Sequence, residues 1–156
     1  MRFLSECRYV TTDESRGVLA ADFVVDLEKG YRGYHEFATL KEGIFATLDD
    51  DIFTLKNGYR SDLCSPAFRI RGKWVGTHTG EREAPAAFIH DAARRLHQIH
   101  CVPFSRKDTD DFFWDALRLK KSRVSRTYHF AVSSFFGTIF LWVTLKKLDC
   151  YCKSYH

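Results

Sequence analysis

The chain is organised around the stretch from Gly58 to Gly137, which begins with the turn GYRSDLCSP (Gly58 to Pro66). An apolar segment follows and carries the pair His90-Asp91, and a segment that reads SRKDTD begins at Ser105. Polar residues therefore occur where the hydrophobic pattern predicts a core. Because a buried charge is costly unless it is paired, these residues need a chemical or a structural role.

Two helices are predicted within this stretch. Pro85 suits the first turn of a helix that ends near Gln98, and its apolar face consists of Ile89, Ala92, Ala93 and Leu96. A second helix begins at Ser105, an N-cap residue, with Asp108 three residues later as its capping-box partner. The apolar face of this second helix consists of Phe112, Phe113, Ala116 and Leu117.

Helical periodicity places Asp110 on the same face as Phe113 and Leu117, so we expect this carboxylate to be buried. A buried carboxylate should be paired, hydrogen-bonded or bound to a metal. The connection between the helices is short, so they should pack antiparallel. That arrangement would bring His90 close to Asp110.

The first half of the chain has the short, glycine-punctuated pattern of β-strands, with runs at 18–27, 37–40, 44–48, 52–55 and 69–75. Asp49-Asp50-Asp51 is interpreted as a solvated acidic turn between two strands. The predicted fold is α+β in a single domain. A small antiparallel β-sheet or meander occupies residues 1–75, a bundle of three to four helices occupies 84–147, and a tail follows at 148–156.

Composition is that of a globular protein, with 45% hydrophobic and 15% aromatic residues in a chain of 156. The net charge of +4 is mild and the basic residues are scattered, so no specific nucleic-acid binding is predicted. Five cysteines, an odd number at wide spacing, indicate reduced thiols in a protein made in the cytoplasm: Cys7, Cys64, Cys101, Cys150 and Cys152.

The segment from Tyr128 to Leu145 contains no Asp, Glu, Lys or Arg and has about the length at which a membrane span comes into question. Polar residues such as His129 and Thr138 dilute its hydrophobicity. We expect a buried helix or helix pair rather than a transmembrane span. The same aromatic segment could also hold a partner subunit or a second copy of the chain.

The candidate catalytic residues are His90, Asp110 and Asp91. A histidine beside a carboxylate on another helix can act as a general base whose tautomer its partner selects. Asp91 follows His90 directly and points about 100° away around the helix, so it would support the site from another side.

The same region could hold one divalent cation, calcium or zinc, through Asp62, His90 and Asp110. The competing interpretation is a buried structural network that fastens the turn to the two helices. In that network Arg106 pairs with Asp62 or Asp91, and Ser65 caps a backbone group. Gly58 and Ser105 would then support the site through the turn and the helix cap.

Taken in order, these residues resemble a phage and prophage family known only as domain of unknown function thirteen fifty-three. The resemblance covers residues 54–137, about half of the chain. Two positions depart from the family pattern: Pro66 follows Ser65 directly, and Arg94 stands where the family commonly has a tyrosine. The residues that carry the resemblance are Gly58, Asp62, Ser65, His90-Asp91, Ser105-Arg106, Asp110, Ala131-Val132 and Gly137.

The resemblance implies a phage protein that is made in the host cytoplasm and can enter the virion. One hypothesis is a hydrolase that acts on the host envelope during entry or lysis, through the His and Asp residues and a divalent cation. The alternative is a non-catalytic virion protein, such as a tail or baseplate component or an assembly factor, in which the same residues form a structural network. Its partners would be other phage structural proteins or the host envelope.

Overall fold

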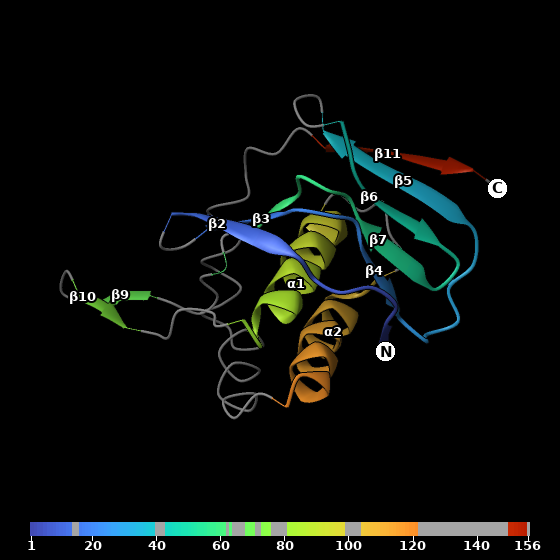
Figure 1. Cartoon of the computed structure of the whole chain (residues 1–156). Helices are drawn as coiled ribbons and strands as arrows, with labels where there is room; N and C mark the ends of the chain where they lie inside the picture. Colours follow the sequence, from blue (N-terminus) through green and yellow to red (C-terminus); the bar gives the residue numbers. More distant parts are fainter. Residues whose placement is uncertain are drawn as a thin grey trace.

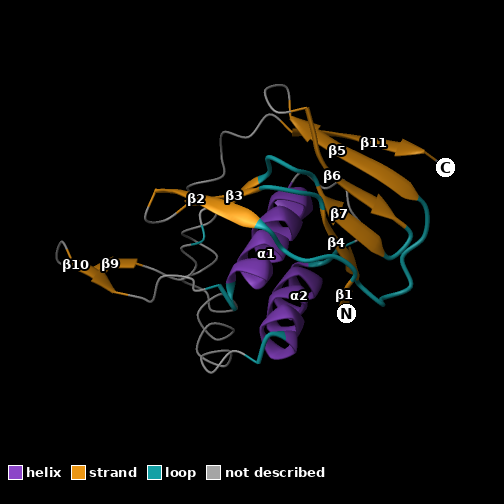
Figure 2. Cartoon of the chain, viewed as in Figure 1, coloured by secondary structure: helices purple, strands orange, loops and turns teal. Residues whose placement is uncertain are grey.

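A computed structural model of the chain describes residues 1–13, 16–39, 43–61, 63, 68–70, 73–75, 81–98, 104–121 and 150–155. Over these residues the fold is α+β, with antiparallel sheets and two helices (Figures 1 and 2). This confirms the predicted fold class. The remainder of the predicted bundle of three to four helices would fall within 122–149, which lies outside the described residues.

The main sheet is antiparallel throughout and contains six of the described strands. Three of them, β5 (Tyr34–Thr39), β6 (Gly43–Asp49) and β7 (Ile52–Leu55), are consecutive and form a meander. The strands β4 (Phe23–Asp26) and β1 (Arg2–Phe3) extend the sheet on one side, and the C-terminal strand extends it on the other. In spatial order the strands are β1, β4, β7, β6, β5 and β11 (Cys150–Tyr155).

Two smaller antiparallel sheets accompany it. One contains β2 (Tyr9–Asp13), β3 (Arg16–Leu19) and β8 (Arg60–Ser61), and the other is a hairpin of β9 (Phe68–Ile70) and β10 (Lys73–Val75). The run at 69–75, predicted as one strand, therefore contributes to two short strands that pair with each other.

The strand β11 corrects the prediction of a tail at 148–156. Cys150–Tyr155 pairs along its whole length with β5, from Cys150 opposite Thr39 to Tyr155 opposite Tyr34. Pairing between strands satisfies the hydrogen-bonding groups of the backbone whatever the side chains are. The polar and mixed composition of residues 150–155 therefore did not indicate a strand.

The acidic turn joins β6 to β7 as predicted, but its carboxylates have backbone partners. Asp51 accepts hydrogen bonds of 2.8 Å from the amides of Gly30 and Tyr31, and Asp50 accepts one of 2.9 Å from Gly33. The backbone of Asp50 is left-handed, with φ 50°, which aspartate tolerates better than most residues. These two carboxylates fasten the loop between β4 and β5.

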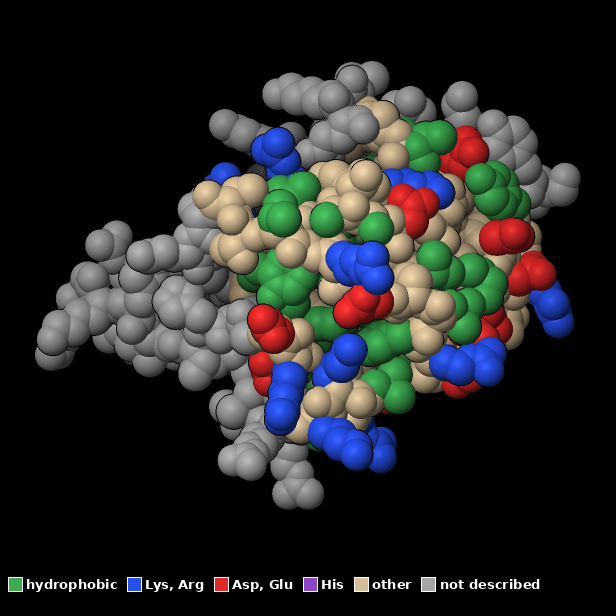
Figure 3. Space-filling view, in the orientation of Figure 1, with side chains coloured by type: hydrophobic (Ala, Val, Ile, Leu, Met, Phe, Trp, Pro, Cys, Tyr) green, Lys and Arg blue, Asp and Glu red, His purple; other side chains and the backbone are tan. Residues whose placement is uncertain are grey.

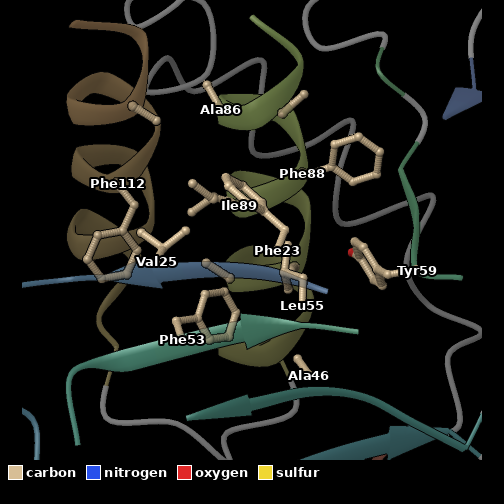
Figure 4. Packing of buried hydrophobic residues seen from close by; sticks show 14 of the residues in the cluster. Phe23, Val25, Ala46, Phe53, Leu55, Tyr59, Ala86, Phe88, Ile89 and Phe112 are labelled. Atoms are coloured by element: carbon tan, nitrogen blue, oxygen red, sulfur yellow. The ribbon is translucent and has the colours of Figure 1, made fainter. Parts of the chain in front are cut away.

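The helices α1 (Ala84–Gln98) and α2 (Arg106–Leu119) pack on one face of the main sheet (Figures 1 and 4). The strands that face them alternate between buried and partly exposed residues, as in β4, where Phe23 and Val25 are fully buried. The four residues of the predicted α1 face are fully buried, and so are most of their neighbours, because α1 also contacts the small sheet through β8. None of the described helices is long and apolar enough to cross a membrane.

Candidate functional site

The two helices run antiparallel, as predicted, and this places the candidate residues on facing turns. Three contacts show the direction: the carbonyl of Phe104 lies 3.0 Å from Nδ1 of His97, Asp110 contacts Arg94, and Phe113 packs on His90. The start of α2 is held by the predicted capping box. The Ser105 Oγ accepts a hydrogen bond from the Asp108 amide, and the Asp108 carboxylate accepts one from the Ser105 amide.

Asp110 is buried, as its helical position predicted, and it is paired. The Nη2 atom of Arg94 donates a 2.7 Å hydrogen bond to its Oδ1, and the side chain of Arg94 is itself only 4% exposed. Burial alone would raise the pKa of the Asp110 carboxyl, but His90 and the guanidinium of Arg94, with a contribution from Arg106, outweigh burial and lower it. Asp110 is therefore an ionised carboxylate held by its neighbours.

The sequence pattern did not identify Arg94 as the partner of Asp110; the pairing predicted from it was that of Arg106 with Asp62 or Asp91, and Asp62 lies outside the described residues. The position of Arg94 one helical turn after His90 was the available signal, because residues four apart lie on the same face of a helix. Arg106 also lowers the pKa of Asp110 through its charge.

His90 lies between two carboxylates and is fully buried. Its Nε2 atom is 3.6 Å from Oδ1 of Asp110 and 3.4 Å from Nε of Arg94, and its Nδ1 atom is 3.7 Å from Oδ1 of Asp91. The ring packs on Phe113 with 4.9 Å between centroids. Among the described residues, Nδ1 of His90 has no hydrogen-bond partner.

The pKa of His90 is raised above its ordinary value. Burial is the largest single influence and lowers the pKa, but the carboxylates of Asp110 and Asp91 together outweigh burial and the repulsion from Arg94. Protonated, the ring has an N–H directed at each carboxylate. Neutral, Nε2 can accept from Arg94 instead, so Arg94 and Asp110 compete for the same nitrogen.

Asp91 points away from the helix pair toward the small sheet, as its position one residue after His90 predicted. The hydroxyl of Ser61 in β8 donates a hydrogen bond to its Oδ2 atom, and the amide of Leu63 donates one of 3.2 Å to the Ser61 oxygen. Leu63 has a left-handed backbone, with φ 48°, which is uncommon for a bulky residue and indicates a tightly determined turn. Ser61 thus joins β8 to α1.

Gly58 lies in the turn that precedes β8. Its φ of 86° favours glycine, and its amide donates a 2.8 Å hydrogen bond to the carbonyl of Leu19. The other predicted turn residues, Asp62 and Ser65, lie outside the described residues, as do Ala131-Val132 and Gly137. The structure therefore brings together His90, Asp91 and Asp110, and adds Arg94 and Ser61.

A divalent cation would have to share Asp110 with Arg94. Among the described residues, no group of three or more His, Cys, Asp or Glu side chains is arranged to hold a metal ion. The guanidinium of Arg94 already supplies positive charge at Oδ1 of Asp110. The predicted cation site that includes Asp62 stays a prediction.

A comparison with known proteins found no relative of this chain: no family model, no curated protein and no solved structure matches it.

Proposed function

We propose that this chain is a non-catalytic protein that acts through its surface, and that the network of His90, Asp91, Arg94 and Asp110 is structural. The observation that carries this proposal is the burial of His90: its side chain is 0% exposed, and a general base must reach the proton that it removes. Within the phage setting that the family resemblance implies, the protein would be a virion component or an assembly factor.

The pairing of Asp110 supports the same proposal. Its negative charge is compensated by Arg94 at 2.7 Å, and the second carboxylate, Asp91, is held by Ser61. Each of these contacts joins two elements: α1 to α2 in the first case, and β8 to α1 in the second. Such an arrangement fixes the positions of three elements around one histidine.

Measuring the stability and the activity of the same variants tests the proposal. We expect Asp110→Asn and His90→Gln to lower the free energy of unfolding, because each leaves a buried charged or polar partner uncompensated. We expect wild-type protein to release no product from peptidoglycan or phospholipid. Product release by the wild type that either variant abolishes, at unchanged stability, would overturn the proposal.

One observation favours a hydrolase-like site as the second candidate. Nδ1 of His90 is directed toward Asp91 without a hydrogen bond, and the Asp91 side chain is 16% exposed, so this side of the network is the one nearest to solvent. In this alternative His90 is the base, Asp110 orients it, and the substrate belongs to the host envelope. Asp91→Asn would then reduce product release while leaving the Arg94–Asp110 pair intact.

A further inference from the structure

The strand β2 forms one edge of the small sheet, whose strands lie in the order β2, β3 and β8 (Figure 1). Its pairing with β3 shows which of its backbone groups point away from the sheet. The amide of Ala20 donates a 2.8 Å hydrogen bond to the carbonyl of Arg8, the residue directly before β2. In an antiparallel pair, such hydrogen-bonded residues alternate with residues whose N–H and C=O groups point outward. The outward groups of β2 are therefore those of Tyr9 and Thr11.

The hydrogen bonds on the other side of β3 agree with this assignment. Leu19 is the residue opposite Tyr9. Its amide donates a 3.0 Å hydrogen bond to the carbonyl of Tyr59, and its carbonyl accepts one of 2.8 Å from Gly58, so its backbone groups point away from β2. Within the part of the chain that the structure describes, the outward groups of Tyr9 and Thr11 form no hydrogen bond.

The side chains of the small sheet alternate between the core and the opposite face. Tyr9 packs on Phe88 of α1 with 5.7 Å between ring centroids, and Gly17 and Leu19 of β3 are buried. Val10 lies on the opposite face and is 56% exposed, more than any other large hydrophobic residue in the described ranges. A single exposed valine is ordinary on a protein surface. This valine, however, stands between two residues whose outward backbone groups are unpaired.

Proteins protect an exposed strand edge by keeping it short, by a β-bulge or by charged residues. The strand β2 has such protection at its ends, where Arg8 precedes it and the register on β3 shifts between Thr11 and Asp13. Its centre, Tyr9-Val10-Thr11, has no charged side chain and consists of residue types that are favoured in strands. Another strand can therefore pair with the centre of β2, over a short length.

We propose that β2 pairs antiparallel with β2 of a second copy of the chain, about a two-fold axis at Val10. In this register Tyr9 of each copy lies opposite Thr11 of the other, and the outward groups of both residues bond to each other. The two Val10 side chains meet at the axis, where a pair that is not hydrogen-bonded brings side chains closest. This inference goes beyond the proposed function, because it depends on the strand edge and not on the network around His90.

The axis at Val10 fits better than its neighbours along the strand. An axis at Tyr9 would place Thr11 opposite Cys7, which precedes β2, and an axis at Thr11 would place Tyr9 opposite Asp13, beyond the register shift. The axis at Val10 pairs the two outward-facing residues with each other. It also covers the exposed valine of both molecules at once, which favours a second copy over a strand of unrelated sequence.

The charges near β2 do not oppose this association. The face in Figure 3 includes β2, and basic and acidic side chains are interspersed on it among hydrophobic ones. Two copies can therefore approach without the repulsion that a surface of one sign would cause.

Sedimentation velocity of the full chain over a range of concentrations tests the proposal. We expect monomer to convert to dimer between micromolar and millimolar concentrations, because the pairing involves few residues. Val10→Lys places two lysines opposite each other and should weaken dimerisation at least about tenfold. Thr11→Pro removes an outward N–H but none of those that bond to β3, so it should also weaken dimerisation while the monomer still folds.

The matched control is Ile44→Lys, which makes the same type of change at another exposed residue, in β6, with 46% of Ile44 accessible. Thermal unfolding of each variant shows whether its fold is intact. A wild type that stays monomeric at every concentration would overturn the proposal. So would a dimer that Val10→Lys weakens no more than Ile44→Lys does.

A disulfide cross-link tests the register and does not depend on the proline variant. Opposite residues at the axis should have Cα atoms about 4.5 Å apart, within the range of about 4.4–6.8 Å that a disulfide spans. Oxidation of Val10→Cys with copper phenanthroline should therefore give more covalent dimer than the wild type, whose native cysteines set the background. Arg8→Cys should stay at background, because Arg8 lies opposite Thr12 in this register. Equal cross-linking of both variants would overturn the proposed pairing.

Discussion

At the scale of single residues, the pairing of Arg94 with Asp110 is the central interaction of the site. Both side chains are almost completely buried, and 2.7 Å separates their charged atoms. In such an environment the cost of desolvation offsets much of the attraction, so the pair need not add much net stability. Removing one partner, however, leaves the other charge buried without compensation.

We therefore expect Arg94→Met and Asp110→Asn each to lower the free energy of unfolding by about 3–5 kcal/mol. The double variant should lose less than the sum, with a coupling energy of about 0.5–3 kcal/mol, because neither charge is then left alone. Urea unfolding of the wild type, the two single variants and the double variant measures the coupling energy. Strictly additive losses would show that the two side chains do not interact in the folded protein.

The pH dependence of stability also follows from this network. The pKa of His90 is raised above 6.5, so its contribution to stability is complete below about pH 6.5 and is lost as the pH rises through the folded-state value. The pKa of Asp110 is lowered, so its contribution is present above about pH 3.9 and is lost as the pH falls through the folded-state value.

Stability should therefore be greatest in mildly acidic solution and should decline as the pH rises above about 6.5. The groups that face His90 and shape this response are Asp91, Arg94 and Asp110, with Arg106 nearby. In His90→Gln the decline on the alkaline side should be much smaller. Urea midpoints of the wild type and this variant at a series of pH values test the prediction, and parallel profiles would contradict it.

At the scale of secondary-structure elements, the contact between β3 and α1 depends on Gly17. A Cβ atom at this position would lie 2.7 Å from Cδ1 of Leu63 and 3.1 Å from Cζ of Phe88. Gly17 is not among the described glycines with a positive φ, so the constraint is the close approach of side chains rather than backbone strain. Gly17 is also paired with Ser61, the residue that contacts Asp91.

We expect Gly17→Ala to destabilise the protein by about 1–3 kcal/mol, as overpacking of a core generally does. The same substitution should cost less in a Leu63→Ala background, because the side chain that it meets is then shorter. Thermal unfolding of the single and double variants decides this. An equal cost in both backgrounds would mean that the clash with Leu63 is not the cause.

At the scale of the whole molecule, β11 closes one edge of the main sheet. Without it, the outer backbone groups of β5 would become an exposed edge, and exposed edges are sites of association between chains. Phe37 and Ala38 in β5 are buried, so the exposed strand would be apolar in part.

We expect a chain that ends at residue 149 to unfold at a lower temperature and to associate at concentrations where the full chain does not. Sedimentation velocity of the two proteins measures this, with a chain that lacks only His156 as the control. A truncated chain that stays as monodisperse as the control would contradict the prediction.

The sequence by itself determined the elements whose signals are local. The cap at Ser105 and Asp108, the buried face that includes Asp110, and the β-rich first half could be predicted because capping, helical periodicity and alternation depend on near neighbours. Burial of Asp110 also implied that it has a partner. The antiparallel direction of the helices followed from the short connection between them.

Only the tertiary structure decided which residue that partner is. Arg94 and Arg106 both lie within reach of Asp110 by sequence, and the packing of α1 on α2 selects the guanidinium that contacts Oδ1. The contact of Ser61 with Asp91 and the pairing of β11 with β5 join residues 30 and more than 100 positions apart. Such contacts depend on how the sheets and helices stack, and no local pattern in the chain specifies that stacking.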